Sequence, residues 1–88
     1  MKNENHYTYK IEKAKARLDA YKNILQIIET EIDRLKDSAA WLQERADKEA
    51  QDGNNSSSEH YRVAAQEERN VLEATESIMD MLIEEAGV

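Results

Sequence analysis

An unbroken heptad repeat is the feature that most constrains the fold of this chain. Apolar residues recur from residue 7 to residue 46 at gaps that alternate between three and four. That spacing gathers them into one stripe along a helix that packs against another helix, as in a coiled coil. The stripe comprises Tyr7, Ile11, Ala14, Leu18, Tyr21, Leu25, Ile28, Ile32, Leu35, Ala39, Leu42 and Ala46. The repeat predicts one long helix over about residues 6–51.

The residues after position 51 predict where the first helix ends. Gly53 is suited to the left-handed conformation that closes a helix, and the two asparagines that follow it tolerate turn geometry. We therefore predict a loop over residues 52–57.

A second helix is predicted over about residues 57–86. Ser56 and Glu59 have the spacing of a capping box, in which each side chain satisfies a backbone N–H of the first turn. Either of the next two serines could be the cap instead. The apolar face of this helix is broad and is interrupted by Glu68 and Thr75. Its members are Tyr61, Ala64, Ala65, Val71, Leu72, Ile78, Met79, Leu82 and Ala86.

The composition is that of a chain of long helices. Because the predicted turn is short, the two helices should run antiparallel. There is no proline and no phenylalanine, and there are two glycines. Strong helix formers such as Ala, Glu, Lys, Leu, Gln and Arg are abundant. We predict an all-α fold, an antiparallel two-helix hairpin of the coiled-coil type that forms a single domain over residues 1–88.

A hairpin of 88 residues buries little surface, so it needs support from outside its own core. The chain has no cysteine, and its two histidines, His6 and His60, are far apart in sequence. We expect no disulfide, no metal and no other cofactor. Oligomerisation is the remaining way to stabilise the hairpin. We predict a homodimer in which two hairpins form a four-helix bundle.

The unequal helix lengths leave part of the first helix without a neighbour. With the turn centred near residues 54–55, position i of the first helix lies near position 109 minus i of the second. Residues 6–22 then extend ~25 Å past the end of the second helix. An isolated helix of that length is marginal in water. We expect another chain to cover it.

Three large apolar residues of the first helix do not belong to its stripe. Ile24 flanks the stripe, whereas Ile27 and Trp41, fourteen residues apart, point well away from it. A group of exposed apolar side chains marks a second packing surface. The predicted oligomer or partner contacts are Tyr7, Ile11, Leu18, Tyr21, Ile24, Ile27 and Trp41.

The net charge of −7 is unevenly distributed along the chain. Residues 1–22 carry +3 and residues 59–86 carry −6. Within the second segment four acids recur at gaps of three, four and four, which aligns them along one side of the helix as an acidic ridge. The ridge comprises Glu73, Glu76, Asp80 and Glu84. Overall acidity opposes direct binding to nucleic acid.

These features predict a small acidic helical module for protein–protein interaction, a regulatory or adaptor protein that acts as a homodimer and also binds an unidentified protein. The alternative is an inhibitor encoded by a phage or plasmid, of the anti-CRISPR or another anti-defence type. Such an inhibitor would use the acidic ridge to block a basic groove meant for nucleic acid, and salt would weaken its binding.

Catalysis is not expected. A two-helix hairpin offers little concavity for a small-molecule substrate, and the chain lacks a cysteine nucleophile and a glycine-rich phosphate loop. The serines next to His60 are explained by helix capping. No apolar run reaches the length of a signal peptide or a membrane span, so we expect a cytoplasmic protein without a membrane partner.

Overall fold

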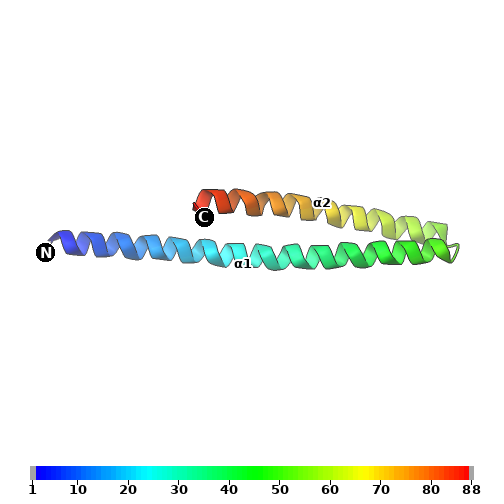
Figure 1. Ribbon diagram of the computed structural model, residues 1–88, viewed down its shortest axis with the longest axis horizontal. Helices are drawn as coiled ribbons and strands as arrows, with labels where there is room; N and C mark the ends of the chain where they lie inside the picture. Colours follow the sequence, from blue (N-terminus) through cyan, green and yellow to red (C-terminus); the bar gives the residue numbers. More distant parts are fainter. Residues whose placement is uncertain (1, 88) are drawn as a thin grey trace.

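The computed structural model describes the backbone of residues 2–87 and the side chains of residues 7–87. The described residues form two helices and no strand: α1 (Lys2–Gln51) and α2 (Asn55–Ala86). The helices run antiparallel and are joined by a short turn, so the molecule is an elongated hairpin of 78 × 15 × 14 Å (Figure 1). The predicted all-helical hairpin is confirmed. The first helix begins at Lys2, before the predicted start near residue 6.

The core of the hairpin is a narrow seam of heptad residues. Leu35 is only 1% exposed and is the one large side chain among the described residues that is fully buried. The other buried residues are Ile32, Ala39, Ala46 and Ala65. Alanines dominate the half of the seam nearest the turn, and the two ribbons lie closer there than at the C-terminal end of α2 (Figure 1). Small side chains allow this close approach.

The turn closes α1 with a left-handed glycine. Gly53 has φ of +82°, and its N–H donates to the carbonyl oxygen of Ala50 at 3.1 Å. The next N–H, of Asn54, donates to the carbonyl oxygen of Glu49 at 2.8 Å. These two bonds form a Schellman motif, which satisfies carbonyl groups that the end of a helix leaves unpaired. The predicted role of Gly53 is confirmed.

The predicted capping box of Ser56 and Glu59 is wrong. The reversal needs only residues 52–54, so α2 begins at Asn55 and the serines already lie inside the helix. The residue at the N-cap, Asn54, makes no capping bond with its side chain. Glu59 pairs with Arg62, and the Ser58 hydroxyl donates to the carbonyl oxygen of Ala46 on α1 at 2.8 Å.

We expect Gly53→Ala to destabilise the hairpin by ~1 kcal/mol, because a side chain disfavours positive φ. A Cβ at this position would meet no atom within 4 Å, so the backbone conformation alone sets this cost. Thermal unfolding followed by circular dichroism measures it. Gly53→Asn is the matched control, since asparagine tolerates the left-handed region and should retain more of the stability. Equal stability of the glycine and alanine forms would contradict the assignment.

Candidate functional site

Two contacts distinguish the two flanks of the hairpin, the surfaces on either side of its seam. On one flank, Arg69 of α2 donates from Nη1 to Oε1 of Gln43 on α1 at 3.3 Å. We call this the charged flank. On the other, the rings of Trp41 and Tyr61 meet edge to face with centroids 6.2 Å apart, and the Arg45 guanidinium lies 5.5 Å from the centre of the Tyr61 ring.

On α1, exposed apolar residues follow the flank that bears Trp41. Steps of seven residues keep a position on the same side of a coiled coil. Ile27 lies fourteen residues before Trp41, and Ile24 lies twenty-one residues before Arg45. Both isoleucines therefore share this flank. Ile27 is 69% exposed, the largest exposed fraction among the large apolar side chains that the structure describes.

The second helix contributes to the same flank. Val71 follows Arg69 by two residues, which is about 200° around the helix axis and thus on the side away from the charged flank. Ile78 follows seven residues later, and Met81 lies one turn beyond it. We define the lateral face as the six exposed apolar residues of this flank. They are Ile24, Ile27, Trp41, Val71, Ile78 and Met81.

The described side chains include eleven large apolar residues that are exposed, and their distribution is uneven. Four lie in the N-terminal part of α1, six form the lateral face, and one, Val63, lies on the outer surface of α2. None of the eleven lies on the charged flank. Exposed apolar residues that gather on one side in this way mark a contact with another molecule.

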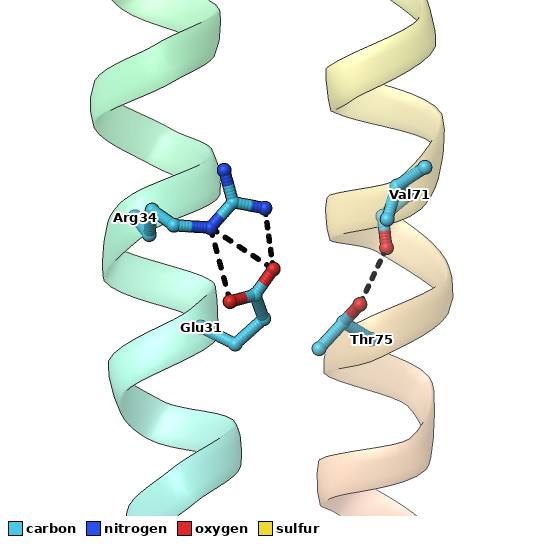
Figure 2. Close-up of polar contacts among 4 residues, drawn as sticks. All are labelled: Glu31, Arg34, Val71 and Thr75. Carbon is cyan, nitrogen blue, oxygen red and sulfur yellow. Dashed lines mark hydrogen bonds and ion pairs between the residues drawn. The ribbon is translucent and has the colours of Figure 1, made fainter.

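An ion pair interrupts the lateral face at its middle (Figure 2). The Arg34 Nε donates to Glu31 Oε2 at 3.0 Å, and both side chains remain about half exposed. The hydrogen bond from Arg34 is the main reason that the pKa of Glu31 is lowered, and the same bond raises the pKa of Arg34. The pair therefore persists at neutral pH and weakens as pH falls through the lowered pKa of Glu31.

The end of the lateral face nearest the turn is aromatic and cationic. Trp41 was predicted to point well away from the stripe of α1, and its ring meets the Tyr61 ring of α2 edge to face while 55% of the residue stays exposed. A tryptophan side chain is long enough to reach across the flank. The Arg45 guanidinium also pairs with Glu49 at 3.4 Å. Trp, Tyr and Arg are the residue types that carry most binding energy at protein interfaces.

The N-terminal part of α1 extends past the end of α2 (Figure 1). Every side chain of residues 7–20 is exposed, and we call this segment the overhang. Its stripe residues Ile11 and Leu18 are 54% and 41% exposed. Tyr21 was predicted to lie in the uncovered part, but it is half buried and lines an open hollow of about 410 Å³ together with Ala86 of α2.

Two polar residues lie within the seam of α2, as expected. Thr75 donates its hydroxyl to the carbonyl oxygen of Val71 at 2.7 Å, so its polar group is satisfied within its own helix (Figure 2). Glu68 is half buried, and its buried Oε2 atom has no hydrogen-bond partner. Its charge lies near Arg34 and contributes to the raised pKa of that guanidinium.

The acidic ridge lies away from the lateral face. Glu76 follows Arg69 by seven residues and so shares the charged flank, with Glu73 and Asp80 one turn to either side. Glu84 lies on the outer surface of α2. All four side chains are exposed, and none of them makes an ion pair within the part of the chain that the structure describes.

The sequence prediction of contact residues omitted half of the lateral face. Val71 and Ile78 belong to the apolar face predicted for the second helix, and Met81 has no predicted role. The heptad spacing of α2 could have identified Val71 and Ile78 as residues outside the seam. Val71 and Ile78 each precede a seam residue by one position, so they cannot both face α1 and continue the alternating spacing.

Other kinds of site find no support among the described residues. No group of three or more His, Asp or Glu side chains there is placed to hold a metal ion. No helix over that same range is long and apolar enough to cross a membrane. In comparisons with known proteins, no family model, no curated protein and no solved structure matches the chain.

Proposed function

We propose that this chain is a protein–protein interaction module that works as a homodimer, in a regulatory or adaptor role. The lateral face carries the proposal, because six exposed apolar side chains from both helices gather on one flank. Packing two lateral faces together buries all of them and converts two marginal hairpins into a four-helix bundle. The same patch on both copies makes a twofold interface.

The spacing of the face favours one arrangement of the two copies. Ile27 and Trp41 are each seven residues from Arg34. A twofold axis at Arg34 therefore sets Ile27 of one copy against Trp41 of the other. It also brings the two Arg34 guanidinium groups together at the axis, with the Glu31 carboxylate of each copy about one turn away, so two positive and two negative charges balance at the centre of the face.

Cysteine cross-linking tests this arrangement, since the chain contains no cysteine of its own. We expect Arg34→Cys to form a disulfide-linked dimer under mild oxidation, because this position lies at the axis. A mixture of Ile27→Cys and Trp41→Cys chains should cross-link to each other more than either does alone. Gel electrophoresis without reductant measures the products.

Asp33→Cys is the matched control for the cross-linking experiment. Asp33 is adjacent to Arg34 in sequence and exposed, but it lies toward the charged flank. It should give little covalent dimer. Equal yields from Asp33→Cys and Arg34→Cys, or no product from any lateral-face cysteine, would count against the proposal.

A second candidate function is inhibition of a protein with a basic groove for nucleic acid. The observation that favours it is the set of four exposed carboxylates of the acidic ridge, none paired within the described chain. The ridge lies opposite the lateral face, so a homodimer would present two such ridges. Negative surfaces of this kind attract basic partners over long range at low salt.

For the inhibitor role, we expect the chain to displace duplex DNA from a basic protein that binds DNA without sequence preference. Replacing Glu73, Glu76, Asp80 and Glu84 by glutamine should weaken displacement by about tenfold or more, because four exposed attractions are lost. Competition followed by fluorescence anisotropy measures this. If displacement were insensitive both to these changes and to added salt, the acidic ridge would have no such role.

A further inference from the structure

The overhang carries an apolar stripe with positive charge on both sides. The stripe residues Ile11, Ala14 and Leu18 continue the heptad repeat of α1 beyond the point where α2 ends. The seam of the hairpin is thus prolonged on α1 alone, and all side chains of residues 7–20 are exposed. The overhang therefore resembles one half of a coiled coil.

The charges of the overhang lie at the positions that coiled coils use to choose a partner. Lys10 and Arg17 are seven residues apart on the side that continues the lateral face, since Ile24 follows at the same spacing. Lys15 lies on the other side, in line with Gln43, and Lys22 follows it by seven residues just beyond the overhang. Residues that border the stripe in this way pair with the bordering residues of the opposing helix.

The acidic residues of the same segment are placed elsewhere. Glu12 and Asp19 each follow a stripe residue by one position, which turns them away from the stripe to the outer part of the helix. Lys10, Arg17 and Ala14 line an open hollow of about 230 Å³, so the cationic border lies directly beside the stripe. An opposing helix would meet an apolar centre between two positive edges.

We infer that the overhang binds an acidic amphipathic helix of a partner protein. This helix would carry an apolar stripe with Glu or Asp on both of its borders, and it would continue the line of α2. The inference rests on the proposed role as a protein-interaction module and names the chemistry of the partner. Burial of the stripe supplies affinity, and the cationic borders select the partner's charge.

The end of α2 brings one acidic residue toward the cationic border of the overhang. Glu85, in the last turn of α2, lines the same hollow as Arg17 and Leu18 of the overhang. The last turn of α2 thus contributes an acid to the hollow that Arg17 also lines. α2 stops there, because Gly87 adopts a left-handed conformation with φ of +75°. A partner helix would extend this arrangement toward the N-terminus of α1.

A second copy of the chain fits the overhang poorly. Two overhangs packed antiparallel on their stripes would set Lys10 of one copy near Arg17 of the other, and like charges at bordering positions are unfavourable. The α2 helix of a second copy is acidic, but Glu73, Glu76 and Asp80 lie away from its exposed apolar residues. It cannot present an apolar stripe with acids on both borders.

Nucleic acid also fits the overhang less well than an acidic helix. Phosphate groups would pair with the lysines and with Arg17, but they would leave Ile11 and Leu18 exposed to water. The overhang is a single straight helix whose cations are separated by an apolar stripe. That arrangement matches an amphipathic helix whose apolar stripe has acidic residues on both borders.

Two synthetic peptides test the inference with the full-length chain. Both have three heptads with Ile and Leu in the stripe, one with Glu and one with Lys at every bordering position. We expect the Glu peptide to bind about tenfold more tightly or better, because attractive border pairs replace repulsive ones. Added salt should reduce its affinity. Fluorescence anisotropy of the labelled peptides measures binding.

Charge reversal of the overhang should invert this preference. In the chain with Lys10, Lys15, Arg17 and the adjoining Lys22 replaced by Glu, we expect the Lys peptide to bind more tightly than the Glu peptide. The matched control replaces Lys36 and Lys48, exposed cations outside the overhang, by Glu. The control should retain the preference for the Glu peptide. Circular dichroism checks that every variant keeps its helix content.

A different set of results would overturn the inference. These are equal binding of both peptides, no binding of either, no inversion in the charge-reversed chain, or tighter binding of a duplex oligonucleotide than of the Glu peptide. The experiment is independent of self-association. A monomeric chain that still selects the Glu peptide would sustain this inference while removing the homodimer from the proposed function.

Discussion

Leu35→Ala is expected to lower the free energy of unfolding by ~2–5 kcal/mol, the range observed when a large buried side chain is truncated. Leu35 is 1% exposed, and the other buried residues of the seam are one isoleucine and three alanines, so no other large side chain in the core is as fully buried. For a domain of this size such a loss shifts the melting temperature by ~10 °C or more. Thermal unfolding at a fixed chain concentration measures it, because self-association also contributes to stability.

Val63→Ala is the control for this change. Val63 is 46% exposed on the outer surface of α2, and alanine is the better helix former, so we expect a change within about 0.5 kcal/mol. A loss at Leu35 no greater than that at Val63 would mean that the seam is not the core of the fold.

The second large effect is expected on assembly. Replacing Ile27 and Met81 by Asp puts two charges on the lateral face, where they are 69% and 67% exposed in a single hairpin but buried in the proposed dimer. Burial of an unpaired charge is strongly unfavourable. We expect the dissociation constant of the dimer to rise by about a hundredfold or more, which corresponds to ~3 kcal/mol. Size-exclusion chromatography with light scattering measures the change in mass.

The matched control adds the same charges elsewhere. Gln26→Asp with Val63→Asp changes two exposed positions outside the lateral face. This chain should keep the mass of the unsubstituted protein, and circular dichroism should show similar helix content in both double variants. Equal masses for the two double variants would exclude the lateral face as the interface.

The heptad repeat was sufficient to predict the two helices and most of the seam. Its spacing selected Leu35, Ala39 and Ala46, which are buried as expected. Gly53 was identified as the end of α1 because only a residue without a Cβ adopts positive φ at little cost. These features depend on local geometry, which a sequence pattern records directly.

Features that depend on contact between the helices were harder to predict. The capping box failed because the Schellman motif at Gly53 and Asn54 completes the reversal before the serines, which freed Ser58 to bond to Ala46. Trp41 was placed by the direction of its Cβ alone, whereas the reach of its ring decides that it meets Tyr61.

The lateral face illustrates the same limit. Ile24, Ile27 and Trp41 were identified as surplus to the stripe of α1, but their neighbours on α2 could be named only once the two flanks of the hairpin were distinguished. The Arg69–Gln43 bond and the Trp41–Tyr61 contact make that distinction. Neither contact follows from the spacing of apolar residues within one helix.

The most direct measurement of the central claim is the molar mass of the unsubstituted chain in solution as a function of concentration. Light scattering over the micromolar range should give twice the chain mass of 10.2 kDa, with dissociation only on dilution. A mass of one chain at every concentration would contradict the homodimer and with it the proposed role of the lateral face.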